Sequence, residues 1–95
     1  MSAWSRGAQA TRMSRYLLHH RHDPHECGVV FAAFKGHDSP LRRQPTLASC
    51  AANGHAVHAI WWTVDAATAE DALCLLPFYV AERTVATAVS EVEIP

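Results

Sequence analysis

Apolar and polar residues alternate, or β-branched residues cluster, in four stretches of the chain, and each stretch predicts a β-strand. The four strands are expected over residues 15–22, 46–52, 55–64 and 84–94. Asn53-Gly54 separates the middle two strands, and this pair favours the positive φ angles of a two-residue type I′ turn. A hairpin with that turn places Leu47 opposite Ile60.

Two stretches with helical periodicity predict helices that follow the first and third strands. Asp23, Pro24 and Glu26 have the spacing of a capping box with proline at the first helical position. The apolar stripe of this first helix recurs every three or four residues: Cys27, Val30, Phe31 and Phe34. Gly36 can serve as the C-cap, so the helix is expected to end there.

The second helix is expected to start at Thr68, because Asp71 follows it at the spacing of an N-cap pair. Leu73 and Leu76 continue an apolar stripe, but Pro77 should kink or end the helix. The order of elements is therefore β-α-β-β-α-β. This is the split βαβ plan of ferredoxin-like α+β domains, in which both helices cover one face of a four-stranded antiparallel sheet.

The third strand is apolar on both of its faces. One face carries His58, Ile60, Trp62 and Val64, and the other carries Val57, Ala59, Trp61 and Thr63. Two helices cover only one side of a sheet, so the second face would expose a large apolar patch unless another chain covers it. We therefore expect a homodimer that packs sheet to sheet.

This order of elements resembles the dimeric α/β-barrel group of ferredoxin-like proteins, which includes cofactor-free monooxygenases, isomerase-like enzymes, YCII-related proteins and small metal-binding members. The segment LLPFYVAERTVATAVSEVEIP is similar to the helix-to-final-strand part of YCII-related chains. The resemblance covers residues 15–95 and includes no catalytic motif. It implies a sheet-lined ligand pocket in a homodimer.

Length and composition indicate one globular domain. The chain has 95 residues, of which 49% are hydrophobic and 18% are charged, whereas disordered chains are poorer in apolar residues and richer in charge. Residues 1–12 show no apolar periodicity and are expected to form a flexible extension, which leaves residues 13–95 as the domain. Met13 is an alternative to Met1 as the native start.

Charge and cysteine content narrow the expected partners and location. The formal net charge is −1 and Lys35 is the only lysine, so no basic patch for nucleic acid is expected. No apolar run reaches the about 20 residues that span a bilayer, and no signal-peptide core is present, which predicts a cytoplasmic protein without a membrane partner. Cys27, Cys50 and Cys74 would then stay reduced, each as a small buried residue.

Residues 19–27 contain four of the seven histidines and one of the three cysteines. In the ferredoxin-like plan the end of the first strand lies beside the start of the third, so His20, His22 and His58 converge if they share a face. Imidazole suits Ni, Zn and Cu(II), and three ligands with one open position make a catalytic or sensing metal site. His25 is expected in solvent, and Cys27 in the buried stripe.

Other interpretations stay open. The histidines can be ordinary surface and pocket-rim side chains, and Trp61 and Trp62 can be core or interface aromatics. As a binding protein, the chain would hold a metal ion or small ligand near the histidines. As a cofactor-independent enzyme, monooxygenase-like or isomerase-like, it would use His20 or His22 as a general base on a small, partly aromatic substrate, with Trp61 and Trp62 lining the ligand pocket.

Overall fold

The computed structural model of the chain describes residues 12–49 and 58–95. The expected extension over residues 1–12, except for Arg12, therefore lies outside the described residues. The expected Asn53-Gly54 turn and Cys50 lie outside them as well. Within the described ranges, no helix is both long enough and apolar enough to cross a membrane.

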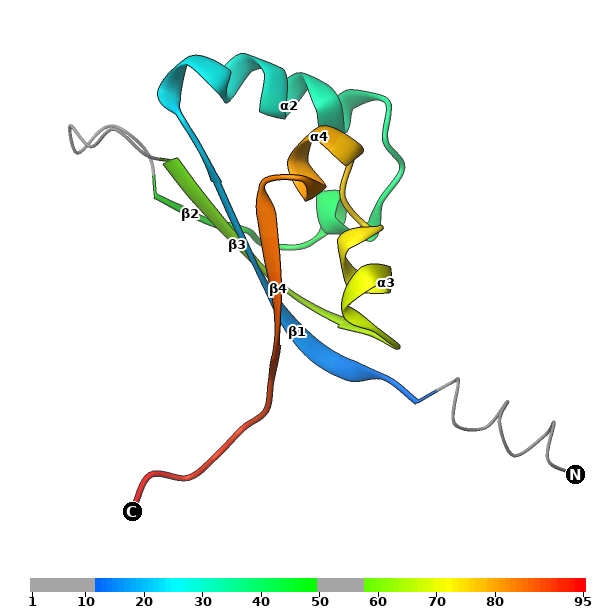
Figure 1. Cartoon of the computed structure of the whole chain (residues 1–95), viewed down its shortest axis with the longest axis vertical. Coiled ribbons are helices and arrows are strands. Elements are labelled where there is room, and N and C mark those ends of the chain that lie inside the picture. Colours follow the sequence, from blue (N-terminus) through cyan, green and yellow to red (C-terminus); the bar gives the residue numbers. More distant parts are fainter. Residues whose placement is uncertain (1–11, 50–57) are drawn as a thin grey trace, which may run out of the picture.

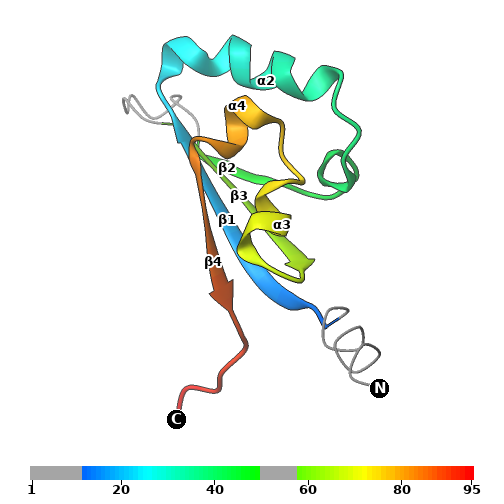
Figure 2. The same cartoon turned by 45° about the vertical axis from the view of Figure 1, so that its right-hand side comes forward.

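The described residues form an α+β fold around a four-stranded antiparallel sheet, which confirms the prediction at this level (Figure 1). In chain order the elements are β1 (Ser14–His22), η1 (Pro24–Glu26), α2 (Cys27–Lys35), η2 (Pro40–Arg43), β2 (Leu47–Ser49), β3 (His58–Ala66), α3 (Ala69–Leu73), α4 (Phe78–Ala81) and β4 (Thr84–Val89). The strands lie in the order β2-β3-β1-β4. Figure 2 shows the helices together on one side of this sheet.

Local signals set the ends of the helical segments. Thr68 is the N-cap of α3, and its side-chain oxygen accepts a hydrogen bond from the backbone N–H of Asp71. Pro77 separates α3 from α4, because proline cannot continue the hydrogen-bond ladder of a helix. The first helical segment begins as the 3₁₀ turn η1 after Asp23 and continues as α2 to the C-cap Gly36. These boundaries confirm the predicted helix starts and the predicted break.

The register of the hairpin differs from the predicted one by one residue. Leu47 pairs with Trp61 instead of Ile60, and Ala48 takes the position opposite Ile60. Because side chains alternate between the faces of a strand, this shift puts Leu47 on the face away from the helices, where it is 73% exposed. The predicted register assumed a two-residue turn, and turn length sets the register of a hairpin.

The apolar stripe of α2 is less buried than its spacing predicts. Phe31 is 63% exposed, and Val30 is the only fully buried residue of the helix. Figure 2 shows α2 lying across α4 instead of flat on the sheet. The short helix α4 therefore covers a narrower strip of α2 than the surface of a sheet would cover.

The last strand is also shorter than predicted. β4 ends at Val89, which pairs with Arg15 near the start of β1. The residues after Val89 have no described strand beside them. The alternating segment up to residue 94 therefore has no strand to pair with in the described structure. Val92 and Ile94 follow in an extended tail, where both are exposed.

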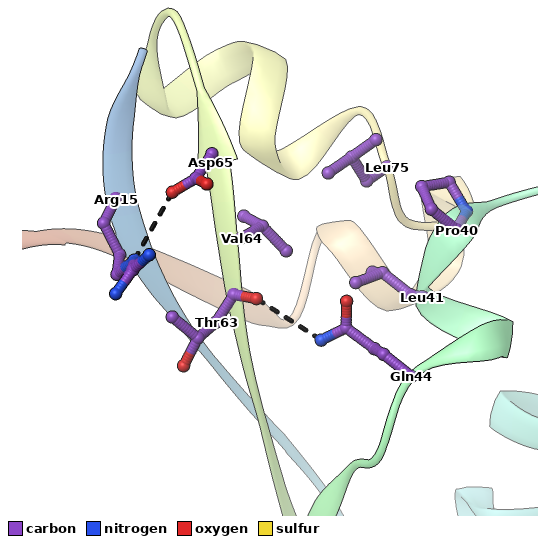
Figure 3. Close-up of a pocket in the computed structure, with 8 residues that line it drawn as sticks. All are labelled: Arg15, Pro40, Leu41, Gln44, Thr63, Val64, Asp65 and Leu75. Atoms are coloured by element: carbon purple, nitrogen blue, oxygen red, sulfur yellow. Dashed lines mark hydrogen bonds and ion pairs between the residues drawn. The ribbon is translucent and has the colours of Figure 1, made fainter.

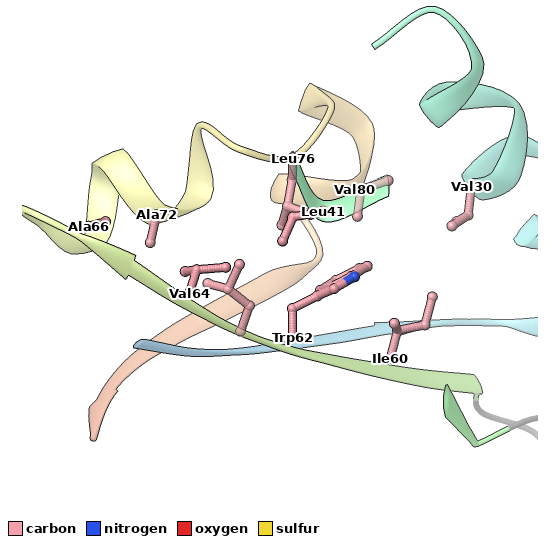
Figure 4. Close-up of a cluster of buried hydrophobic side chains, with 10 residues drawn as sticks. Val30, Leu41, Ile60, Trp62, Val64, Ala66, Ala72, Leu76 and Val80 are labelled. Carbon is pink, nitrogen blue, oxygen red and sulfur yellow. The ribbon is translucent and has the colours of Figure 1, made fainter. Parts of the chain in front are cut away.

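The hydrophobic core lies between the sheet and the helical segments (Figure 4). The sheet contributes Leu18 from β1 and Ile60, Trp62 and Val64 from β3. The helical segments and turns contribute Val30, Leu41, Ala72, Leu76 and Val80. The inward-facing histidines of β1 and β3 lie in the same layer, so they are held between the sheet and its helical cover.

The other face of the sheet carries a row of four side chains, one from each strand. Leu47, Trp61, His19 and Val85 lie opposite one another across β2, β3, β1 and β4. The rings of His19 and Trp61 stack with their centroids 5.2 Å apart, while Leu47 and Val85 are exposed. We call these four residues the open-face row.

Candidate metal centre

The pairing of β1 with β3 brings His22 and His58 together. They are direct partners in the antiparallel register, and their ring centroids are 5.2 Å apart. Both are buried on the helix-covered face, at 5% and 7% exposure. His20 lies two residues before His22 on the same face and is fully buried. The three histidines named from the sequence therefore share one face of the sheet.

Helix α2 adds a third donor, Cys27, to the histidine pair. Cys27 is the first residue of α2, and its Sγ lies 3.5 Å from Nδ1 of His58. One donor atom from each of His22, Cys27 and His58 lies within 4.8 Å of the other two. Ligand atoms of one tetrahedral zinc are about 3.3–3.6 Å apart, given bonds of about 2.0–2.3 Å. A small contraction would therefore let all three residues bind one ion.

The helical spacing predicted Cys27 in the buried stripe and did not indicate it as a candidate ligand. The turn through η1 brings the start of α2 back over the end of β1, and Cys27 is half-buried beside the histidines rather than enclosed among apolar side chains. A usable signal was present, since Cys27 follows His22 closely across a strand-to-helix turn. Its helical spacing with Val30 hid that signal.

His20 does not join this donor group, because both of its ring nitrogens already have partners. Its Nδ1 lies 3.3 Å from the carbonyl oxygen of Val80 and 3.1 Å from Oγ1 of Thr84. Its Nε2 lies 2.9 Å from Nδ1 of His22. The arrangement thus differs from the set expected from the sequence: Cys27 stands beside His22 and His58, and His20 stands behind His22.

Burial favours the neutral form of these imidazoles. It is the main cause that lowers the pKa of His20, with the neighbouring His22 as the next. The pKa of His22 is lowered in the same way, first by burial and then by His58. Neutral imidazole is the form that can bind a metal ion, so this environment favours the form of His22 that has a lone pair for a ligand.

Two buried nitrogens of the group have no hydrogen-bond partner among the described residues: Nε2 of His22 and Nε2 of His58. A buried polar atom without a partner costs free energy, and most such atoms in folded proteins are satisfied. A cation held between these side chains would give the free lone pair of an imidazole the partner that it lacks.

A second cluster anchors the turn that carries Cys27. The Glu26 carboxylate accepts hydrogen bonds from the Tyr79 hydroxyl at 2.6 Å, from Arg83 Nε at 3.0 Å and from the Asp23 backbone N–H at 3.0 Å. The Arg83 guanidinium also stacks on the Tyr79 ring, 3.7 Å from its centroid. The Tyr79 hydrogen bond is the largest cause that holds the pKa of Glu26 at about 2. These bonds tie η1 to α4 and the start of β4.

Asp23, His25 and Glu26 form a second group with metal-ligating atoms close together. Asp23 and His25 are exposed, as expected for His25, and both oxygens of Glu26 already accept hydrogen bonds. Exposed carboxylates near a histidine are common on protein surfaces. The group around His22 is the stronger candidate, because it is buried and has free donor atoms.

The two tryptophans point to opposite faces of the sheet and do not line one pocket. Trp62 lies in the core, and its ring centroid is 6.3 Å from that of His20. It lines an apolar pocket of about 230 Å³ together with Phe31, Phe34, Leu41, Arg42, Gln44, Thr46 and Ile60. Trp61 belongs to the open-face row. Alternation along β3 is the reason, since adjacent residues of a strand face opposite ways.

A further pocket of about 280 Å³ lies beside the part of β3 that β2 does not cover, next to η2 (Figure 3). Gln44 donates a hydrogen bond to the carbonyl oxygen of Thr63 there, and Arg15 pairs with Asp65 at 3.4 Å. The lining contains no histidine or cysteine. This pocket therefore has no part in the chemistry of the donor group.

His37 and Cys74, which lie in the described part of the chain, do not belong to this donor group. Nε2 of His37 lies 3.2 Å from the carbonyl oxygen of Leu75, which holds the loop after α2 against the segment after α3. Cys74 is exposed, so the prediction that it is a small buried residue is wrong. It follows the short helix α3 as the C-cap, and Ala72 makes the buried contact of that helix instead.

Comparison with known protein families, curated proteins and solved structures finds no match to the chain. The donor chemistry of the site is therefore the guide to its ligand. Two imidazoles and one thiol are ligands that zinc and other borderline or soft cations prefer, whereas Mg²⁺ and Ca²⁺ prefer oxygen. Three protein ligands also leave one position of a tetrahedral ion open.

Proposed function

We propose that the protein binds a transition-metal ion through His22, Cys27 and His58. The observation that carries this proposal is a pair of buried imidazoles whose Nε2 atoms have no partner among the described residues, together with the Cys27 thiol 3.5 Å from Nδ1 of His58. Bulk water and exposed charges do not explain such an arrangement. A cation that accepts lone pairs from both imidazoles and from the thiolate does.

Zn²⁺ is the ion that this ligand set suits best. Zinc accepts mixed nitrogen and sulfur ligands in tetrahedral sites, and Ni²⁺ and copper are its nearest competitors for imidazole and thiolate. The site offers three protein ligands instead of the four of a closed structural centre. A fourth position would be filled by water or a small ligand, which is the arrangement of catalytic and sensing sites.

A ferredoxin-like sheet-to-sheet homodimer is part of the same proposal. It is supported by the strand order β2-β3-β1-β4, by the placement of the helices on one side of the sheet, and by the apolar open-face row on the other side. Packing a second copy against that row would remove the exposed Leu47 and Val85 from water. The metal site lies on the opposite face, so each chain would hold its own ion.

The metal proposal is tested by titrating the metal-free full chain with Co²⁺, a spectroscopic substitute for zinc. We expect one ion per chain and a thiolate-to-cobalt charge-transfer band in the near ultraviolet. Cys27→Ala should abolish the band and weaken binding, whereas Cys74→Ala, which removes an exposed thiol far from the histidines in sequence, should keep both. A wild-type chain without the band, or a band that survives in Cys27→Ala, would contradict the proposal.

Zinc should also stabilise the folded chain, because an ion that binds the native state and not the unfolded state shifts the equilibrium toward folding. At a free zinc concentration of about 100 times Kd, the gain is about 2.7 kcal/mol. The melting temperature of wild type and of Cys74→Ala should rise with added Zn²⁺. That of Cys27→Ala should rise much less.

The apolar pocket beside Trp62 supports a second candidate function, the binding and turnover of a small aromatic compound without a cofactor. Its walls include Phe31, Phe34 and Trp62, and the ring of His20 lies 6.3 Å from that of Trp62, centroid to centroid. This function ranks second because both nitrogens of His20 are already in hydrogen bonds. Quenching of Trp62 fluorescence by small aromatic compounds in the metal-free chain, lost in Trp62→Phe, would favour it.

A further inference from the structure

A chain of hydrogen bonds leads from the end of α4 to the proposed metal centre. The carbonyl oxygen of Val80 lies 3.3 Å from Nδ1 of His20, and Nε2 of His20 lies 2.9 Å from Nδ1 of His22. Thr84, the first residue of β4, contacts the same nitrogen of His20, with its Oγ1 3.1 Å from Nδ1. His20 is fully buried, so water does not compete for these bonds.

The first link has only one possible direction. A carbonyl oxygen cannot donate, and the Thr84 hydroxyl already donates to the carbonyl of Val80 at 2.7 Å. Both neighbours of Nδ1 of His20 therefore act as acceptors. His20 must carry its proton on Nδ1, and a neutral His20 then has a lone pair on Nε2.

The second link follows from the first. Because Nε2 of His20 accepts, Nδ1 of His22 must donate, so the proton of neutral His22 lies on Nδ1. Its Nε2 then holds a lone pair, and this atom is buried and has no partner in the described part of the chain. The backbone carbonyl of Val80 thus decides, through His20, which nitrogen of His22 is free.

We propose that His20 is a positioning residue for the metal centre: with Val80 and Thr84 it holds His22 in the Nδ1–H tautomer and presents Nε2 of His22 to the ion. This inference rests on the proposed metal-binding function. Metal-binding histidines usually donate their other ring N–H to a carbonyl or carboxylate, which sets the tautomer and the ring orientation. Here the imidazole of His20 accepts the hydrogen bond from His22 and donates its own N–H to the backbone carbonyl of Val80.

The burial of His20 has no other evident use. A leucine at this position would contribute to the core without the cost of burying two polar atoms. Leu18, two residues earlier on the same face of β1, does so. Every side-chain hydrogen bond of His20 belongs to the series that links Val80 and Thr84 to His22. A residue that served packing alone would need none of them.

The tautomer is tested first in the metal-free chain, where it does not depend on metal binding. Two-bond ¹H–¹⁵N correlations of the histidine side chains, recorded at a pH where His22 is neutral, identify which nitrogen carries the proton. We expect the Nδ1–H form for both His20 and His22 in wild type. His20→Leu should shift His22 toward a mixture of tautomers, whereas His20→Gln, whose amide oxygen can still accept from Nδ1 of His22, should keep much of the preference.

Metal affinity is the second measurement, made by competition for Co²⁺ and Zn²⁺ with a chelator. Loss of a partner behind a metal-binding histidine weakens affinity by about 10–100-fold, and we expect that loss in His20→Leu. Thr84→Val should give a smaller loss of affinity, because it removes one of the two acceptors at Nδ1 of His20. Thr87→Val, a matched change at an exposed position of the same strand, should change nothing.

Each outcome separates the two proposals. A wild-type His22 with its proton on Nε2 would overturn the inference even if the chain binds metal. Unchanged affinity in a folded His20→Leu or Thr84→Val variant would overturn the positioning role and leave the metal site standing. A chain that shows the Nδ1–H tautomer but binds no ion would overturn the proposed metal site and, with it, the role of His20 toward the ion. Should His20→Leu fail to fold, His20→Gln and Thr84→Val decide the question.

Discussion

The two faces of the sheet use the same residue types for different purposes. On the helix-covered face, His20, His22 and His58 are buried, and Trp62 is part of the core. On the other face, His19 stacks on a half-buried Trp61, and both lie in a row with exposed aliphatic side chains. Histidine and tryptophan have the same chemistry on both faces. What differs is the layer of helices.

The covered face removes water from its imidazoles, and this has two consequences. Burial lowers the pKa of His20 and of His22, which favours the neutral form of both, and hydrogen bonds between buried groups persist without competition from solvent. On the open face His19 contacts water and an aromatic ring. A metal site is therefore expected on one face, and a surface for contact with another chain on the other.

The largest expected effect separates the two tryptophans. Trp62→Ala removes a large side chain from the core and should lower the free energy of unfolding by about 3–5 kcal/mol. Trp61→Ala should cost much less when measured at a protein concentration low enough to dissociate any dimer. Urea unfolding followed by circular dichroism measures both values. Similar losses for the two variants would mean that the faces are not different in the way described.

A second test asks whether another copy of the chain covers the open face. Trp61→Asp places an unpaired charge in the middle of the open-face row, so it should weaken association by at least about tenfold, or about 1.4 kcal/mol. Sedimentation equilibrium of wild type should give a dimer at micromolar concentration. Phe78→Asp, at an exposed position on the helical side, is the control that should leave association unchanged. A monomeric wild type would remove the dimer proposal.

The smallest expected effects on stability come from two ion pairs, Arg15–Asp65 and Arg83–Glu26. Arg15 of β1 and Asp65 of β3 form an exposed pair, and such pairs contribute about 0–1 kcal/mol, so Arg15→Ala should barely change the melting temperature. Arg83 pairs with a less exposed Glu26 and stacks on Tyr79. Arg83→Ala should lower the melting temperature more than Arg15→Ala does, because the ion pair with Glu26 and the stacking on Tyr79 are lost together. An equal response would show that the Glu26 cluster does not anchor η1.

Sequence patterns alone predicted the local architecture of this protein. The N-cap at Thr68, the break at Pro77, the helix start after Asp23 and the antiparallel α+β arrangement follow from interactions within a few residues or from simple alternation along a strand. Alternation also put His20 and His22 on one face, and the order of elements put His58 near them. The region of the candidate site was therefore predictable, and so was the presence of imidazole groups in it.

Tertiary structure decided which atoms can act together. Only the path of the chain through η1 brings Cys27 beside His58, and only the approach of α4 and β4 engages both nitrogens of His20. The same holds for the exposure of Phe31 and for the hairpin register, which depend on what lies across from each residue. Helical spacing and strand alternation describe neighbours along the chain. A donor group built from β1, α2 and β3 is set by neighbours in space, which no local pattern contains.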